Sequence, residues 1–399
     1  MRPFDGRRVL LVVSGGIAAY KTAFLARRLI ESGARVDVIL TASAGRFVGP
    51  VTFEGITGRP VHTDLWARPM AHLDLGRSAD AVVVAPATAD LLARLAAGAA
   101  DELATATLLA CDRPVLLCPA MNTRMWAHPA TVRNVETLRG FGHEIVGPDD
   151  GPLAEGESGP GRMAEPPEIL ARLGRILEPD GGLRGLKVVV TAGPTRAALD
   201  PVRFLSNRSS GRMGYALASA AWRRGADVVL VSGPGHAPRP LGPRRIEVET
   251  ASEMLATLET ELRDARILLM AAAVGDFEAG SVARHKIKKG EKGRLELELD
   301  AAPDLLVETR ALRERHGVFT LGFALETENA LENGRTKLER KGLELIAVNL
   351  ANEPDSGFDV DTNRVTLLDA AGDTEALPLL SKNELADRLL DRIEESLGT

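Results

Sequence analysis

The chain has 399 residues, of which 45% are hydrophobic, and this length exceeds what one ordinary core serves, so two domains are expected. Its 55 acidic against 49 basic side chains give a formal net charge of −6, which argues against a general nucleic-acid-binding protein. No apolar run approaches the ~20 residues of a membrane span, and the two cysteines, Cys111 and Cys118, provide no disulfide framework, so we expect a cytoplasmic protein without a membrane partner.

Short apolar runs alternate with helical stretches through the first half of the chain. The first run ends in Ser14, Gly15 and Gly16, and small or hydroxylated residues follow several of the others. This alternation predicts a doubly wound, mainly parallel α/β sheet, whose carboxyl edge is where such sheets bind ligands. A phosphate-bearing ligand is expected there, although small residues also simply permit tight turns. The predicted strands are Val9–Val13, Val36–Leu40, Ala81–Ala85 and Val115–Cys118.

The first half closes with turn-rich segments. Gly159-Pro160-Gly161 suggests a mobile flap, and an amphipathic helix is predicted over Pro166–Leu177. Residues 178–182 then break the pattern, so we place the domain boundary there. The predicted domains are 1–178 and 186–399, joined by a linker at 179–185.

The second half repeats the same logic. Val188–Thr191 is a predicted strand, and a long polar loop, Asp200–Arg212, separates it from a helix over Gly214–Arg224. A long loop at the ligand edge of a sheet is often functional, and it can equally be a subunit contact. Further strands are expected at 225–233, 246–248, 267–271, 319–323 and 345–348, an edge hairpin at 365–370 and 374–379, and helices at 252–262, 303–315, 327–340 and 384–397.

The run Arg284–Lys292 is the sharpest charge feature of an otherwise acidic chain. It follows Ala271–Asp276, a predicted apolar strand that ends in glycine and aspartate. Most charge runs are solvated surface, but lysines beyond such an edge can neutralise phosphates. Asp276 could help to hold a metal ion that bridges phosphate oxygens.

Ordered motifs in the first half carry a resemblance to a known family. They are VSGGIAAYK (13–21), HLDLGRSAD (72–80), APATAD (85–90), PAMN (119–122) and GPGRM (159–163). In this order they resemble the flavin-dependent cysteine decarboxylases, above all the decarboxylase half of the bifunctional phosphopantothenoylcysteine decarboxylase/phosphopantothenate–cysteine ligases. The resemblance implies a Rossmann-like FMN-binding domain that forms trimers with sites between subunits. It implies FMN contacts at Ser14, Gly15, Thr41, Ala87 and Thr88. It also implies that His72 is catalytic and that Asn122 holds the substrate carboxylate. Without the resemblance, His72 would be interpreted as a structural residue and Asn122 as a turn residue.

The implied reaction explains why a flavin is needed. 4′-Phosphopantothenoylcysteine has no carbonyl in the β position to receive the electrons that departing CO₂ leaves behind. Oxidation by FMN at the CH₂–SH carbon makes a thioaldehyde, which is such a sink, and the returned hydride with a proton gives 4′-phosphopantetheine. His72 would assist the thiol proton or the carbanion-like transition state.

One position departs from the family pattern. Relatives have a cysteine that donates the last proton, and here Glu155 occupies its place in Leu153–Met163. A carboxylic acid can donate that proton if burial raises its pKa toward neutrality. We therefore favour Glu155 as a working substitute over an inert flap residue.

The second half resembles the ligase domain of the same bifunctional enzymes. The motifs are TAGPTR, LDPVRFLSNRSSGRMG, AAAVGDF, KIKK, APDLL and GFALET, followed by Lys337 and Lys341, with Gly275 and Phe277 as small departures. The resemblance implies condensation of 4′-phosphopantothenate with cysteine, with CTP and Mg²⁺, through an acyl-cytidylate that the amine of cysteine attacks. It implies a dimer formed partly by Asp200–Arg212 and, with the trimers, a dodecamer. The implied CTP-binding residues are Asp276, Lys286, Pro303, Asp304, Leu305, Leu306, Phe323, Lys337 and Lys341, and Asn207 would contact the acyl intermediate.

Other functions fit parts of the chain. A nicotinamide dehydrogenase would need a better GxGxxG than Ser14-Gly15-Gly16 and an acidic ribose partner. Non-enzymatic regulatory relatives of the decarboxylase carry long acidic tails, whereas this chain ends in a predicted helix. A peptide-cysteine decarboxylase would not need the second half.

Overall fold

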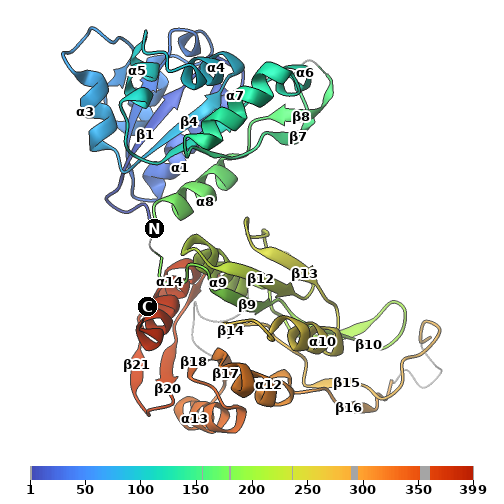
Figure 1. Ribbon diagram of the computed structural model, residues 1–399. Helices are drawn as coiled ribbons and strands as arrows, with labels where there is room; N and C mark the ends of the chain where they lie inside the picture. The colour runs from blue at the N-terminus through green and yellow to red at the C-terminus, as the bar shows by residue number, and fades with distance from the viewer. Residues whose placement is uncertain are drawn as a thin grey trace. The chain divides into compact units, whose positions relative to one another are not determined.

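The computed structural model describes residues 2–154, 156–178, 181–235, 237–288, 295–350 and 360–398. These residues divide into two compact units, Met1–Pro179 and Asp180–Thr399, and each has its own sheet and its own hydrophobic core (Figure 1). Within the described ranges, no helix is both long enough and apolar enough to cross a membrane. The two units are described in turn.

In its described residues, the first unit is built on a six-stranded parallel sheet with the order β3-β2-β1-β4-β5-β6. Apart from Arg8 at the start of β1, the central strands β1 and β4 are apolar and buried because helices cover both faces, and they therefore appear in the sequence as continuous hydrophobic runs. An antiparallel hairpin, β7–β8, follows the sheet. The strands are β1 (Arg8–Val13), β2 (Arg35–Leu40), β3 (Val61–His62), β4 (Ala81–Ala87), β5 (Val115–Pro119), β6 (Glu144–Ile145), β7 (Asp149–Pro152) and β8 (Ser158–Arg162).

Helices cover both faces of this sheet. Apolar side chains of α1, α2 and α8 pack on one face, and those of α3, α4, α5 and α7 pack on the other. Gly33, at φ 95°, ends α1 in the left-handed conformation that glycine tolerates. The helices are α1 (Ala19–Glu31), α2 (Pro50–Thr57), α3 (Ala71–Ser78), α4 (Ala89–Ala96), α5 (Leu103–Leu109), α6 (Thr123–Trp126), α7 (Pro129–Gly140) and α8 (Pro166–Ile176), with a 3₁₀ turn, η1, at Ala44–Arg46.

The second unit has, in the part of the chain that the structure covers, an eight-stranded sheet with the order β13-β12-β9-β14-β17-β18-β20-β21. Its first six strands in this order are parallel, and β20 and β21 add an antiparallel edge hairpin. The sheet strands are β9 (Lys187–Ala192), β12 (Asp227–Ser232), β13 (Arg244–Glu247), β14 (Ile267–Met270), β17 (Phe319–Glu326), β18 (Leu345–Leu350), β20 (Thr366–Asp369) and β21 (Thr374–Ala376). Two-stranded antiparallel pairs outside it join β10 (Arg196–Ala198) with β11 (Phe204–Ser206), β15 (Phe277–Ala279) with β16 (Leu299–Ala301), and β19 (Thr362–Asn363) with β22 (Leu380–Ser381).

The helices of the second unit also lie on two faces. Apolar side chains of α9 and α14 pack on one face, and those of α10, α11 and α13 pack on the other. Reciprocal capping boxes start α10, through Thr250 and Glu253, and α14, through Ser381 and Glu384. The helices are α9 (Arg212–Arg223), α10 (Ala251–Glu261), α11 (Leu305–Glu308), α12 (Arg310–His316), α13 (Ala330–Lys341) and α14 (Lys382–Leu397).

The predicted doubly wound α/β class is confirmed, and three local predictions are wrong in part. The helix predicted over 303–315 is two short consecutive helices that meet at Thr309. The Thr309 hydroxyl donates to the Leu305 carbonyl at 2.6 Å beside the Thr309 N–H at 3.1 Å, and such a side-chain bond to the preceding turn bends a helix. The predicted loop Asp200–Arg212 contains β11, which pairs with β10 just before it. The helix predicted from 327 begins at Ala330, because Asn329 is left-handed at φ 48°.

Candidate functional site

A pocket of about 1140 Å³ lies at the carboxyl edge of the first sheet. Loops that follow β1, β2, β4 and β5 form it, together with the N-terminal part of α1 and the end of β8. This is the edge at which doubly wound sheets bind ligands. Predicted site residues that line the pocket are Ser14, Gly15, Thr41, Thr88 and Asn122.

Ser14 links two of these loops. Its hydroxyl donates to the Pro86 carbonyl at 2.7 Å, and it accepts a hydrogen bond from the Thr88 backbone N–H at 3.1 Å. Thr88 in turn caps α4, because its hydroxyl accepts from the Leu91 N–H at 3.4 Å. The turns after β1 and β4 therefore hold each other in place through short hydroxylated side chains, which leaves room for a ligand above them.

Gly15 closes the other side of the same cradle. A Cβ atom at Gly15 would lie 2.4 Å from the Cβ of Ser43, so only glycine fits there. Thr41 fixes the turn that carries Ser43, because its hydroxyl accepts from the Ala44 N–H at 3.2 Å. Backbone and small polar atoms thus line this part of the pocket, as expected of a site that holds a phosphate.

An ion-pair cluster joins α1 to the end of β8 at the pocket wall. The buried Lys21 ammonium lies 2.9 Å from the Glu165 carboxylate and donates to the Met163 carbonyl at 3.2 Å. Arg162 also bonds to the Glu165 carboxylate. Hydrogen bonds from Arg162 and then from Lys21 lower the pKa of Glu165 below its usual value. Glu165 is therefore held as an anion between two cations.

The β7–β8 hairpin lies against the segment that carries Asn122. The Met121 N–H donates to the Gly161 carbonyl at 2.9 Å, and a Cβ atom on Gly161 would lie 2.2 Å from the Met121 carbonyl oxygen. Asn122 caps α6 by accepting from the Arg124 N–H at 2.8 Å, and its side-chain amide donates to Glu157 at 3.3 Å. Sequence reasoning missed Glu157 because nothing in the motifs indicates a contact across 35 positions.

Two of the predicted residues stand apart from this pocket, and a third cannot be placed. Ala87 is buried at the end of β4, and His72 is half-buried on α3; the described pocket-lining residues include neither. Figure 1 shows α3 and the β7–β8 hairpin on opposite sides of the first unit. Glu155 lies outside the described residues.

Neither cysteine is placed to act as an acid in this pocket. Cys118 is fully buried in β5, and burial strongly raises the pKa of its thiol. Burial also raises the pKa of the half-buried Cys111 thiol. Neither is among the described residues that line the pocket, so the chain's own proton donors there are not thiols.

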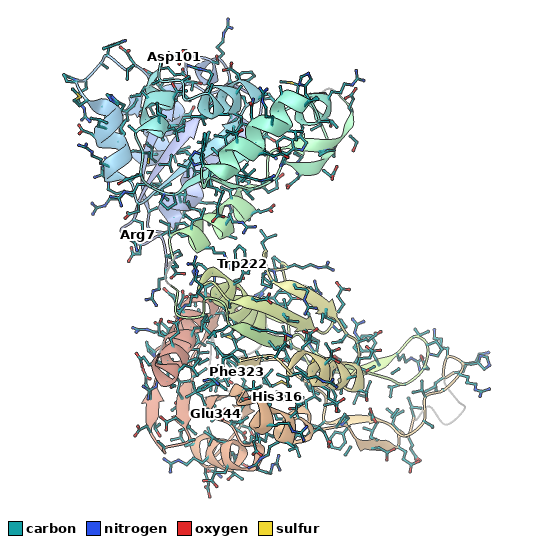
Figure 2. All side chains as sticks on the ribbon, in the orientation of Figure 1. Arg7, Asp101, Trp222, His316, Phe323 and Glu344 are labelled. Carbon is teal, nitrogen blue, oxygen red and sulfur yellow. The ribbon has the colours of Figure 1, made fainter. Side chains whose placement is uncertain are left out.

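A second pocket, of about 640 Å³, lies at the carboxyl edge of β14, β17 and β18. The N-terminal ends of α9 and α14 border it from one face of the sheet, and α11 with the end of α13 borders it from the other. Phe323 lies among the strands of this unit (Figure 2). Predicted site residues that line this pocket are Asn207, Asp276, Pro303, Asp304, Leu305, Leu306, Phe323 and Lys341.

Two predicted lysines lie elsewhere in this unit. The Lys337 ammonium is 2.5 Å from the Glu326 carboxylate, and Lys286 is exposed. Neither is among the described residues that line the second pocket. The segment of Lys286 is fixed by its neighbour, because the Ile287 N–H donates to the Asp200 carboxylate at 3.0 Å. The end of the basic run, 289–292, lies outside the described residues.

Other contacts fix the residues that do line this pocket. The Lys341 ammonium lies 3.0 Å from the Asp304 carboxylate, and the Asn207 amide donates to the Ala273 and Val274 carbonyls at 3.2 and 3.1 Å. No group of three or more histidine, cysteine, aspartate or glutamate side chains suited to a metal occurs within the described segments.

A buried arginine beneath this pocket was also missed. Arg313, 2% exposed, donates to the backbone carbonyls of Leu306 at 2.8 Å and Lys341 at 2.7 Å. It further donates to the Gly342 carbonyl at 2.9 Å and to the Thr320 hydroxyl at 3.0 Å. One guanidinium thus joins the two segments that carry Leu306 and Lys341.

Known protein families match the two units of this chain separately. The family described as Flavoprotein matches residues 2–177, and the DNA/pantothenate metabolism flavoprotein C-terminal domain matches residues 183–397. The chain is 44% identical over 402 residues to the coenzyme A biosynthesis bifunctional protein CoaBC of Vibrio cholerae, with 100% of both chains covered. The chain belongs to the CoaBC family. The CoaBC of Escherichia coli strain K12 is 44% identical over 394 residues, covering 97% of each chain.

A solved structure of the CoaBC family covers part of this chain. The C-terminal domain of a coenzyme A biosynthesis bifunctional protein CoaBC is 35% identical, covers 55% of this chain and 98% of its own, and has a TM-score of 0.47. The resemblance to the bifunctional decarboxylase–ligase family that the motifs indicated is confirmed by the full-length CoaBC relatives. As a CoaBC-family member the chain is an enzyme of coenzyme A biosynthesis with a flavoprotein half.

Proposed function

We propose that the chain catalyses two consecutive steps. Residues 186–399 would ligate cysteine to 4′-phosphopantothenate with CTP, and residues 1–178 would decarboxylate the product, 4′-phosphopantothenoylcysteine, to 4′-phosphopantetheine, with 179–185 as the linker. The observation that carries this proposal is the presence of two separate ligand-edge pockets, each within one of the two matched families. A cytoplasmic location would suit both reactions.

The first pocket fits FMN. The turn at Gly15 has no room for a side chain, which leaves backbone and hydroxyl groups facing the ligand. Ser14, Gly15, Thr41 and Thr88 would hold the cofactor there, and Ala87 would contribute from the end of β4. When bound, FMN supplies a reversible acceptor for a hydride equivalent.

The chain's own residues would hold the substrate of the decarboxylase. Asn122 lines the pocket, and its side-chain amide, which donates to Glu157, is proposed to hold the substrate carboxylate. Glu155 is proposed as the acid that delivers the final proton. The β7–β8 hairpin contacts the segment of Asn122 through the Met121 N–H and the Gly161 carbonyl.

The decarboxylase unit is proposed to act as a trimer. His72 is absent from the described lining of its own chain's pocket, so we assign it to the pocket of a neighbouring copy. Exposed apolar side chains border the pocket, at 62% for Ile17 and 60% for Phe24, and a second copy would cover them. The ligase units are proposed to pair through residues 200–212, which would combine both contacts into a dodecamer.

The second pocket is proposed to bind CTP. Residues Pro303–Leu306, Phe323 and Lys341 would hold the nucleotide, and Asp276 would share a Mg²⁺ ion with its phosphates. Lys286 and Lys337 would add positive charge from outside the pocket. Asn207, which also lines the pocket, would contact the acyl-cytidylate.

Two assays test the proposal. Purified protein should be yellow with bound FMN. It should release pyrophosphate from CTP once 4′-phosphopantothenate is supplied, and repeated turnover should also need cysteine. Lys286→Gln should lose acyl-cytidylate formation while FMN binding and decarboxylation remain. Normal ligase turnover in this variant would remove Lys286 from phosphate binding, and colourless protein that consumes no CTP would refute both activities.

A further inference from the structure

Glu157 places a carboxylate against two donors on the segment that follows β5. One oxygen accepts from the Asn122 side-chain amide at 3.3 Å, and the other accepts from the Arg124 guanidinium at 3.0 Å. Two donors therefore meet the two oxygens of a single carboxylate. Any other carboxylate of the same shape, including that of an amino-acid derivative, matches this arrangement.

The donors are held in this orientation by the backbone. The Asn122 side-chain oxygen accepts from the Arg124 N–H at 2.8 Å, which fixes the amide and directs its NH₂ group toward Glu157. Arg124 is on α6, the same short helix that Asn122 caps. The pair is therefore present before any ligand arrives.

The hairpin reaches the donors because two glycines permit it. A Cβ atom on Gly161 would lie 2.2 Å from the Met121 carbonyl oxygen, and one on Gly159 would lie 2.9 Å from the Thr123 hydroxyl. These glycines let β8 approach the segment 121–123 closely. Glu157, which directly precedes β8, is thereby delivered to Asn122 and Arg124.

We propose that Asn122 and Arg124 together form the subsite for the carboxylate that the substrate loses, and that Glu157 occupies this subsite as an internal competitor. The inference rests on the proposed decarboxylase activity and adds Arg124 and Glu157 to its residues. A substrate carboxylate takes over both hydrogen bonds, and Glu157 returns to them once CO₂ has left. The donors are then paired at every stage of turnover.

Arg124 and Glu157 are exposed enough for a substrate carboxylate to replace Glu157. The Arg124 side chain is 84% exposed and that of Glu157 is 43% exposed. Exposed ion pairs contribute little net free energy, because water solvates both partners when they separate. Glu157 therefore competes weakly, and it affects only ligands that carry a carboxylate.

Competition from Glu157 should weaken the binding of the substrate and not that of the product. 4′-Phosphopantothenoylcysteine carries the carboxylate, and 4′-phosphopantetheine does not. Glu157→Gln keeps the size of the side chain and removes its charge. We expect the KM for the substrate to fall about two- to fivefold while the inhibition constant of the product stays the same.

Arg124→Gln is the matched variant on the other side of the pair. It should raise the KM for the substrate by a similar factor and leave the product constant unchanged. In an Arg124→Gln background, Glu157→Gln should have a smaller effect on KM, because the shared donor is gone. Both variants are measured in the full chain with FMN bound.

The remaining outcomes decide against the proposal. An unchanged substrate KM in Glu157→Gln, or substrate and product constants that move together, would overturn it. A collapse of kcat with unaltered KM would mean that Glu157 transfers a proton instead. If the unsubstituted chain neither decarboxylates the substrate nor binds the product, the proposed function itself fails, and this outcome is distinct from the others.

Discussion

Gly15 and Ser43 approach each other so closely that a Cβ atom on Gly15 would lie 2.4 Å from the Cβ of Ser43 and 2.8 Å from its carbonyl carbon. Both residues line the first pocket, and they come from the loops after β1 and β2. The two loops can converge on one ligand only because position 15 has no side chain. The size of the cradle is therefore set by a single glycine.

Gly15→Ala should therefore weaken FMN binding while the second unit keeps its activity. Overpacking of this kind costs about 1–3 kcal/mol, so we expect the FMN dissociation constant to rise about tenfold or more. Gly16→Ala is the control, because its Cβ would lie 3.5 Å from Thr88 Cγ2, an ordinary contact. Titration followed by FMN fluorescence measures the affinity of both variants for FMN. Equal affinities would contradict the conclusion that FMN binding needs the close approach of Gly15 and Ser43.

The two lysines near the end of α13 should differ in their effect on the ligase. Lys341 lines the second pocket beside Asp304, whereas Lys337 is paired with Glu326. Lys341→Gln should raise the KM for CTP about ten- to a hundredfold, since hydrogen bonds to charged groups are the strong ones. Lys337→Gln should raise it less. Steady-state pyrophosphate release measures both KM values. A larger rise for Lys337→Gln than for Lys341→Gln would show that Lys337 leaves Glu326 and binds the nucleotide.

Arg313 should act on CTP binding through the segments it joins. Its hydrogen bonds to the carbonyls of Leu306 and Lys341 hold both walls of the nucleotide side together. Arg313→Lys keeps the charge but loses the planar guanidinium and at least one of its buried hydrogen bonds. We therefore expect the KM for CTP to rise about fivefold to tenfold. The KM for cysteine and the decarboxylase rate should stay unchanged. A parallel rise in both KM values would show that Arg313 does not act on CTP binding alone.

The sequence predicted the strands and their ligand edges well because buried parallel strands are continuous apolar runs. The run Val9–Val13 and the turn at Ser14 lie where their pattern placed them. The contacts that complete the sites could not be predicted. Arg313 is a charged residue in a polar helix, and nothing local indicates that burial surrounds it with carbonyl oxygens. The contact of Glu157 with Asn122 depends on two glycines that let a hairpin approach.

The tether between α1 and β8 should make the first unit sensitive to acid. Hydrogen bonds from Arg162 and Lys21 lower the folded-state pKa of Glu165. A depressed carboxyl pKa adds stability above the unfolded pKa, and this stability is lost as the pH falls through the folded pKa. Glu165→Gln should thus lower the Tm by about 2 °C at neutral pH, given the exposure of the pair. The difference from the unsubstituted chain should vanish in acid, and a Tm difference that is constant with pH would contradict this.

Glu155→Gln tests whether a carboxylic acid has replaced the family's thiol. Neither cysteine of the chain is among the described residues that line the first pocket, so a thiol from this unit does not stand in for it. If Glu155 delivers the last proton, the variant should still release CO₂ but yield the unreduced enethiol instead of 4′-phosphopantetheine. The rate of forming the reduced product should fall at least about a hundredfold, because a positioned acid usually contributes that much. Mass spectrometry of the products distinguishes the two compounds. Glu155→Asp, which keeps the acid but shortens it, should retain part of the reduced product, whereas full conversion by Glu155→Gln would remove Glu155 from the mechanism.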